Sequence, residues 1–165
     1  LFFTDKIEKF IPPKKGKKHI LYIIRELIGF EPEGTGTDLK LALEYATNVI
    51  KRRCTAFLIS DFIGAGAMYK PLLIASNRHE VNAIQIYDRR EAELPNVGLV
   101  KFHDAETGND LWVDTAIASV RNQYGQAWRD NQNDIEQLFT RTGVNHVSVR
   151  TDQDYVKALM HLFKC

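Results

Sequence analysis

Apolar side chains recur along the chain with two spacings, one typical of helices and one typical of strands. Apolar residues three or four positions apart predict amphipathic helices, and short continuous apolar runs predict strands buried on both faces. The predicted elements are a hairpin over Leu1–Phe10 with an edge strand at Ile7–Ile11, helices over Ile20–Leu27 and Leu39–Ile50, a buried strand at Ala56–Ile59, a short helix at Leu72–Asn77, a buried strand at Val81–Tyr87, a hairpin from Val97–His103 and Asp110–Val113, a long helix over Thr115–Arg141, a strand at Val147–Val149, and a last helix that begins with a capping box at Thr151–Asp154 and buries Tyr155, Leu159, Leu162 and Phe163.

This order of elements predicts an α/β fold. Strands that alternate with helices favour a mostly parallel sheet with right-handed crossovers and helices on both faces. The Val97–Val113 hairpin interrupts that alternation, so we expect it to be an insertion outside the sheet. Gly143 follows the long helix and is expected to end it. At 165 residues, with no repeat or low-complexity linker, the chain is expected to form a single domain, residues 1–165.

Composition narrows the classes of function. The chain is 44% hydrophobic and 26% charged, which is typical of folded proteins, and its formal net charge is +1. A nearly neutral chain has no overall field that attracts nucleic acid or an anionic membrane, so we expect neither as a partner. Cys54 and Cys165 lie far apart without metal-ligand spacing, which favours a reducing, cytoplasmic location. For Cys54 we expect a small buried side chain rather than a nucleophile.

Two segments are candidates for a ligand site, because loops at the carboxyl ends of parallel strands converge in such folds. One is the Gly34–Asp38 loop, which leads into a helix, and the other is Asp61, which follows the strand at Ala56–Ile59. A threonine hydroxyl and a carboxylate are oxygen donors that magnesium accepts. Each also has a purely structural interpretation: Thr37 is a suitable N-cap for a helix beginning at Asp38, and Asp61 could start the next loop.

Several motifs together resemble a known family. Gly36-Thr37-Asp38 and the segment Phe57–Phe62 look like the second and third motifs of a von Willebrand factor A domain. More narrowly, the chain resembles the bacterial von Willebrand factor A-like family catalogued as domain-of-unknown-function family fifty-eight. The matching stretches cover essentially the whole chain and are Phe10–Gly16, Phe30–Asp38, Leu94–Gly98 and Asp104–Gly108.

The resemblance implies a Rossmann-like sheet of von Willebrand factor A type and assigns Thr37 and Asp61 to a metal-ion-dependent adhesion site. That site also requires an Asp-x-Ser-x-Ser loop after the first strand, and no such string occurs in the sequence. We therefore expect a fragment that lacks the first strand and first helix. With Thr37 and Asp61 alone the ligand set is incomplete, so we expect no cofactor here and magnesium only in a complete domain.

Three hypotheses of function follow. The first is a non-catalytic protein-interaction module in which Thr35, Thr37, Asp61 and Phe62 contact a protein partner; the resemblance implies a MoxR-type AAA+ ATPase. The alternative is a magnesium-dependent phosphoryl-transfer or hydrolase domain that uses Asp61 and the Gly34–Thr37 loop. The third, ranked last, is nucleic-acid binding through Lys14–Lys18, a charge run that is more commonly just solvated. Because a missing first strand would leave the strand at Ala56–Ile59 with an open edge, we also expect a homo-oligomer.

Overall fold

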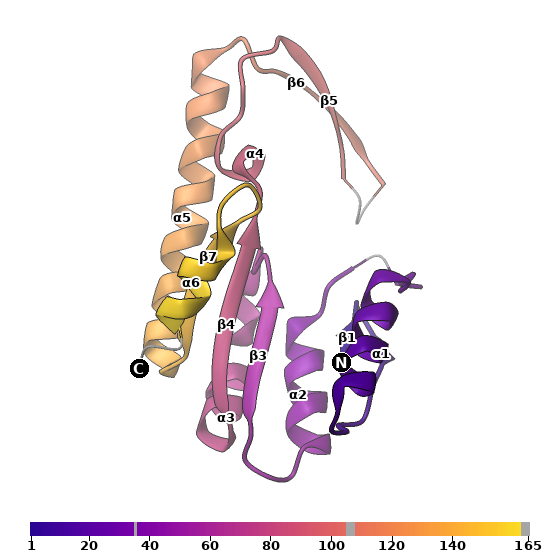
Figure 1. Cartoon of the computed structure of the whole chain (residues 1–165). Coiled ribbons are helices and arrows are strands. Elements are labelled where there is room, and N and C mark those ends of the chain that lie inside the picture. Colours follow the sequence, from indigo (N-terminus) through magenta and orange to yellow (C-terminus); the bar gives the residue numbers. More distant parts are fainter. Residues whose placement is uncertain (35, 105–107, 163–165) are drawn as a thin grey trace.

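The centre of the fold is a three-stranded parallel sheet (Figure 1). The structure is a computed structural model that describes residues 1–34, 36–104 and 108–162. Strands β3 (Thr55–Ser60), β4 (Glu80–Tyr87) and β7 (Asn145–Arg150) lie in the order β3-β4-β7, with β4 in the middle. Ala56 is in register with Val81, and Ile84 with Val147. The predicted α/β class with a parallel sheet is thereby confirmed.

Helices connect the strands of this sheet and pack beside them. Most begin and end within a few residues of the predicted bounds, and Gly143 ends the longest with a φ of 66°, as predicted. The helical elements are α1 (Lys17–Ile28), α2 (Leu39–Val49), the 3-10 turn η1 (Ala65–Met68), α3 (Tyr69–Arg78), α4 (Arg89–Ala92), α5 (Ala118–Thr142) and α6 (Tyr155–Leu162).

One face of the sheet carries the core. Val81 and Ala83 of β4 are buried there, and Ala56 and Leu58 of β3 pack beside them. The opposing layer comes from α2, α3 and α5 and from the loop after β3. Its buried side chains are Leu39, Leu43, Phe62, Met68, Leu72, Ala75, Ile135, Leu138 and Phe139. Removal of this apolar surface from water is the main force that holds the helices to the sheet.

The other face of β3 differs from the prediction. We expected both faces of this strand to be buried, but Phe57 is 44% exposed and Ile59 is 55% exposed. Phe57 and Ile59 alternate with Ala56 and Leu58 and therefore lie on the face opposite the core. β3 is also an edge strand: it pairs with β4, and no other strand among the described residues pairs with it. A continuous apolar run therefore did not distinguish a central strand from this edge strand.

Two helix starts also differ from the prediction. Asp38, not Thr37, is the N-cap of α2, because its carboxylate accepts a hydrogen bond from the backbone N–H of Leu41 at 2.9 Å. The capping box expected at Thr151–Asp154 is absent from the start of α6. Asp154 instead accepts a hydrogen bond from the N–H of Val156 at 2.9 Å, and the Thr151 hydroxyl donates to another loop.

The predicted hairpin insertion projects away from the sheet (Figure 1). Its strands are β5 (Leu99–His103) and β6 (Asp110–Asp114), which pair antiparallel; residues 105–107 of the expected turn lie outside the described residues. Fully buried Thr115 holds the two ends of this hairpin together. Its hydroxyl donates a hydrogen bond to the carbonyl of Gly98 at 2.7 Å and accepts one from the N–H of Val97 at 2.9 Å. A second, shorter hairpin joins β1 (Phe2–Phe3) to β2 (Ile7–Lys9), as predicted near the amino terminus.

Two helices are more exposed than their apolar patterns predicted. No residue of α1 is buried, and Ile20 and Leu27 on its apolar side are 59% and 63% exposed. In α6, Tyr155 was expected to be buried but is 60% exposed, whereas Leu162 is buried; Phe163 lies outside the described residues. Both patterns are amphipathic, but the surface that would cover the apolar side is not supplied by the described residues.

Candidate functional site at the carboxyl edge of the sheet

The chain turns sharply at the carboxyl end of β3, and this turn presents Asp61 to solvent. The Asp61 Oδ1 accepts a hydrogen bond from the N–H of Ile63 at 3.1 Å, and the Ser60 Oγ accepts one from the N–H of Phe62 at 3.2 Å. Phe62 adopts the left-handed region with a φ of 58°, which is uncommon for an aromatic residue. Its fully buried ring packs edge-to-face on Phe139, with 5.1 Å between centroids. Core packing thus holds the strained turn that orients Asp61.

Phe62 therefore has a different place from the one expected. The sequence suggested it as a partner contact beside Asp61, but a side chain with 0% exposure faces the core rather than a partner. Sequence spacing could not separate these roles, because a Phe next to a turn can point either way. Phe62 supports the site by packing, and the exposed group is the carboxylate of Asp61.

A buried glutamine connects this turn to β7, the strand at the opposite side of the sheet. The Gln85 side chain is 1% exposed; its Nε2 donates to the backbone carbonyl of Asp61 at 3.1 Å, and its Oε1 accepts from the Ser148 hydroxyl at 2.8 Å. The bridge joins β3, β4 and β7 at one level of the sheet. Both ends of the amide are satisfied, as burial requires. Sequence reasoning missed Gln85, since its partners lie 24 and 63 residues away.

The second candidate loop is held by an internal carboxylate. The Glu8 Oε1 of β2 accepts hydrogen bonds from the N–H groups of Gly34 and Glu33, at 2.9 and 3.2 Å. The N–H of Gly34 and the hydroxyl of Thr4, in that order, hold the pKa of Glu8 below its usual value. The amides of Glu33 and Gly34 are therefore already occupied by an anion of the protein itself.

Thr37 lies exposed beyond this loop, with Asp38 capping α2 behind it. Thr35, the remaining residue expected in the site, lies outside the described residues. Thr37 and Ser60 both line a groove of about 710 Å³ that follows the whole of β3, and Asp61 is not among the residues that line it.

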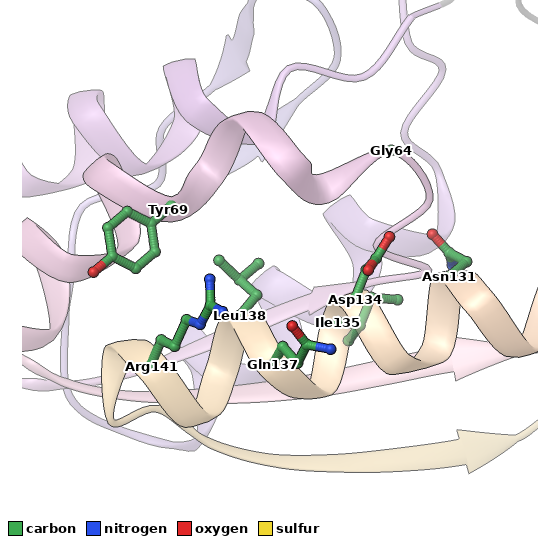
Figure 2. Close-up of a pocket in the computed structure, with 8 residues that line it drawn as sticks. All are labelled: Gly64, Tyr69, Asn131, Asp134, Ile135, Gln137, Leu138 and Arg141. Atoms are coloured by element: carbon green, nitrogen blue, oxygen red, sulfur yellow. The ribbon is translucent and has the colours of Figure 1, made fainter.

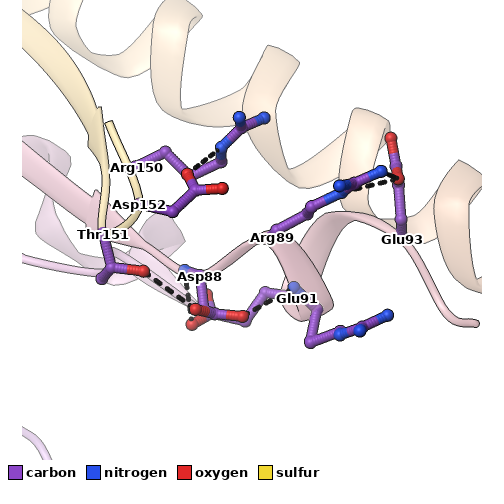
Figure 3. A network of polar contacts seen from close by, with 8 residues as sticks. Asp88, Arg89, Glu91, Glu93, Arg150, Thr151 and Asp152 are labelled. Atoms are coloured by element: carbon purple, nitrogen blue, oxygen red, sulfur yellow. Dashed lines mark hydrogen bonds and ion pairs between the residues drawn. The ribbon is translucent and has the colours of Figure 1, made fainter. Parts of the chain in front are cut away.

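The next strand ends in a polar network that the sequence did not single out (Figure 3). Asp88 follows β4 and caps α4: it accepts from the N–H of Arg90 at 2.8 Å, and the Glu91 side chain accepts from the N–H of Asp88 at 3.1 Å. The Thr151 hydroxyl, which follows β7, donates to Asp88 at 2.8 Å. The N–H of Arg90 first and the Thr151 hydroxyl second lower the pKa of Asp88. Aspartates thus follow both β3 and β4 at this edge.

The donors at this edge do not fit magnesium well. Thr37 and Asp61 supply two oxygen-bearing side chains, and Oδ1 of Asp61 already accepts hydrogen bonds from Ile63 and Ser60. Within the described residues no group of three or more His, Cys, Asp or Glu is placed to hold a metal ion. Magnesium requires six nearly octahedral ligands, so most of its shell here would be water.

A polar pocket lies just beyond the turn (Figure 2). It has a volume of about 340 Å³ and lies between Gly64, which precedes η1, and the carboxyl-terminal half of α5. Asp134 and Arg141 of α5 contribute charges of opposite sign, and Tyr69 of α3 stands at the other side. Asp134 and Arg141 are exposed, whereas Ile135 and Leu138, which also line the pocket, belong to the buried core.

The structure also shows the surroundings of the basic run Lys14–Lys18 and of Cys54. Lys14, Lys15 and Lys18 surround a groove of about 580 Å³ beside Pro12 and Tyr22, so the basic run is clustered rather than scattered.

Cys54 is only partly buried, and its Sγ lies 3.5 Å from Nδ1 of His79. We had expected a small buried side chain for Cys54. The contact with His79, 25 residues along the chain, arises because parallel pairing brings the start of β4 beside the start of β3.

These features define an α/β domain with a parallel sheet and polar loops at its carboxyl edge. The chain belongs to the family described as "Protein of unknown function DUF58", whose model matches residues 1–134. This confirms the family that the motifs suggested. None of the helices in the described ranges is both long and apolar enough to cross a membrane.

Relatives are uncharacterised proteins of mycobacteria. Uncharacterized protein Rv1480 of Mycobacterium tuberculosis is 32% identical over 150 residues, which are 88% of this chain and 46% of that protein. Uncharacterized protein MAV169 of Mycobacterium avium is 30% identical over 158 residues, 93% of this chain and 92% of that protein. The chain spans about half the length of Rv1480 and of its Mycobacterium bovis equivalent. Among solved structures, conserved hypothetical protein BatB from Bacteroides thetaiotaomicron is similar with a TM-score of 0.49 and 15% identity, over 87% of this chain and 66% of that one.

Proposed function

We propose that this chain is a non-catalytic protein-interaction module of von Willebrand factor A type, which binds a protein partner at the carboxyl edge of its sheet. The observation that supports this most directly is the turn at Asp61. A buried aromatic ring and a buried glutamine hold that turn, yet its carboxylate is presented to solvent. Rigid support behind an exposed polar group favours recognition, because little conformational entropy is lost when a partner binds.

The proposed contact residues are Thr37 and Asp61, with Thr35 added from the sequence alone. They form the remnant of a metal-ion-dependent adhesion site, in which a hydrated magnesium ion would contribute only in a complete domain. The proposed partner is a MoxR-type AAA+ ATPase in the cytoplasm, an assignment that rests on the resemblance stated above.

The internal carboxylate favours binding over phosphoryl transfer. A phosphate that used the N–H groups of Gly34 and Glu33 would have to displace the Glu8 carboxylate from them. Displacement would leave the Glu8 carboxylate beside an incoming anion, and like charges repel. A magnesium and nucleotide turnover assay distinguishes the two: the enzyme alternative requires turnover that Asp61→Ala abolishes.

The binding test uses a MoxR-type ATPase from the same genome and a matched pair of variants. We expect Asp61→Asn to weaken binding about tenfold or more, since it removes the exposed charge and keeps the shape. Asp130→Asn, at an exposed position on α5, should leave binding within about twofold of the original. Equal binding by all three proteins would refute the proposed contact site. Absence of binding by the unaltered protein would refute the proposed partner.

A further inference from the structure

The basic run after β2 lines a groove that is separate from the sheet. Every described residue that lines it belongs to the segment 9–22, so one local stretch of the chain builds it, and its volume is about 580 Å³. The stretch comprises the end of β2, the linker that follows and the first two turns of α1. Figure 1 shows α2 between α1 and β3, so the groove is not part of the site at Asp61.

Most of the positive charges at this groove lack partners within the described residues. Lys14, Lys15 and Lys18 line it and are exposed, and no carboxylate in the described part of the chain forms an ion pair with them. Lys9 differs, because it pairs with Glu26. No acidic side chain is among the described residues of the lining. Three ammonium groups therefore share one groove without a carboxylate between them, and like charges that share a site disfavour one another.

The amino end of α1 adds to this positive potential. Its N-cap is Gly16, which has a φ of 107° and no side chain, so no side-chain oxygen caps the helix. The first turn contains no acidic residue and instead holds Lys17 and Lys18. The amino end of a helix carries a partial positive charge, which normally favours Asp or Glu and disfavours cations. An anion bound in the groove would offset both the helix end and the unpaired lysines.

Apart from His19, the rest of the lining is apolar or aromatic. Its members are Phe10, Ile11, Pro12 and Tyr22. The Phe10 ring packs edge-to-face on Tyr45 of α2, with 6.1 Å between centroids, and the Tyr22 ring stacks on His19, with 6.2 Å between centroids. These contacts hold the apolar walls in place beside the lysines. The groove thus offers both positive charge and apolar surface.

We infer that this groove binds an acidic segment of a protein partner, one that contains carboxylates and apolar side chains together. The carboxylates would pair with Lys14, Lys15 and Lys18, and the apolar side chains would pack on Ile11 and Pro12. Complementary charge of this kind gives specificity and rapid association. Neither Thr37 nor Asp61 lines the groove, so the inference does not depend on the proposed function.

A nucleic acid fits this surface less well than an acidic peptide does. Phosphates continue along a strand, and the affinity of a nucleic acid grows with the number of phosphates that the protein neutralises. The unpaired lysines here are confined to one short segment, and the formal net charge of +1 gives no wider positive field. A short peptide segment needs only the groove itself, whose volume lies within the range of about 300 to 1,000 Å³ that is typical of ligand sites.

The test titrates the protein into a fluorophore-labelled peptide of eight residues in which glutamates and leucines alternate, and follows fluorescence anisotropy at about 0.15 M salt. Two double variants with the same net charge form a matched pair: Lys15→Glu/Lys18→Glu changes the groove, and Lys51→Glu/Lys70→Glu changes exposed lysines outside it. We expect saturable binding that the first weakens about tenfold or more and the second less than about twofold, because salt at this concentration screens charges beyond about 8 Å. If the first variant fails to fold, Lys14→Gln/Lys15→Gln in the linker replaces it.

Changes to the ligand separate an acidic peptide from other occupants. A peptide with glutamine in place of glutamate should bind at least tenfold more weakly, and one with serine in place of leucine should also bind more weakly, because each loses one of the two complementary features. A labelled single-stranded oligonucleotide of similar length should bind more weakly than the acidic peptide. The inference is overturned by absence of saturable binding, by equal effects of the two double variants, by equal binding of the glutamine or serine peptide, by tighter binding of the oligonucleotide, or by self-association in sedimentation that Lys15→Glu/Lys18→Glu dissociates.

Discussion

Gln85→Glu should destabilise the protein in a strongly pH-dependent way. The substitution keeps the shape of the side chain but replaces the Nε2 donor, which lies 3.1 Å from the carbonyl of Asp61, with a carboxyl oxygen. Ionised, that oxygen would face a carbonyl oxygen at a position that is 1% exposed. Burial without a cationic partner raises the pKa of a carboxyl group, by up to about 3 to 5 units.

The size of the destabilisation follows from the difference between the pKa of the new carboxyl group in the folded state and its pKa in the unfolded state. The carboxyl group has an unfolded-state pKa of about 4.3, and each unit of difference between the two states is about 1.4 kcal/mol. If the folded-state pKa exceeds 7, the penalty at pH 7 is about 3 to 4 kcal/mol. Because the folded-state pKa is raised, the penalty is smallest below about pH 4, where the protonated group can donate to the Asp61 carbonyl. It grows as pH rises toward the folded-state pKa.

Urea unfolding of the original and altered proteins at pH values from about 5 to 8 measures this difference. We expect the loss in unfolding free energy to increase by about 1.4 kcal/mol per pH unit over the lower part of that range. Gln123→Glu, at an exposed position on α5, is the control and should show no such slope. A loss that stays constant with pH would refute the argument that Gln85 is a buried donor to the Asp61 turn.

Three further predictions test the core, the loop and the capping box. Leu72→Ala, at a position with 0% exposure, should cost about 2 to 5 kcal/mol in thermal or urea unfolding, while Leu21→Ala, 56% exposed on α1, should cost far less; equal losses would contradict the assigned core. Gly34→Ala should destabilise the protein by about 1 to 3 kcal/mol, because the new Cβ would lie 2.9 Å from the Thr4 Cβ. Gly36→Ala is the control: its Cβ would lie 3.5 Å from the nearest atom, and it should be tolerated when both variants are unfolded thermally. Asp88→Asn should weaken the pH dependence of the unfolding free energy on the acid side. The folded-state pKa of Asp88 is lowered, so its contribution to stability is present above the unfolded-state pKa and lost as pH falls through the folded-state pKa. An unchanged pH dependence on the acid side would count against the capping box.

The periodic parts of the fold could be predicted from the sequence, and its neighbour relations could not. The helix that ends at Gly143 and the hairpin from Leu99 to Asp114 follow from local pattern and turn chemistry, which act over a few residues. The open edge of β3 was expected from the resemblance, but the burial of both its faces was predicted wrongly, because an apolar run does not show which faces other layers cover. That information lies in the rest of the fold.

The candidate site shows the same division. Asp61 and Thr37 were found because each follows or precedes a predicted element at the carboxyl edge of the sheet. Gln85 and Glu8 were missed because the partners that define their roles lie 24 to 63 residues away. Single-sequence patterns contain no signal for such pairs. Asp88 also has a distant partner in Thr151, but its capping box with Glu91 is local, and the Asp-x-x-Glu spacing was a signal that we did not use. A polar residue inside an apolar strand, as Gln85 is, was the one local indication that a buried network exists.

The path of the chain between β4 and β7 has a consequence for the order of folding. These adjacent parallel strands are separated by residues 88–144, which include the projecting hairpin and all of α5. The hairpin and the helix consist of local contacts and can form within microseconds, but the β4–β7 ladder must first close a long loop. We therefore expect the third strand to join late, in the rate-limiting step. The Gln85–Ser148 hydrogen bond, which crosses that ladder, would then form only on the native side of the main barrier.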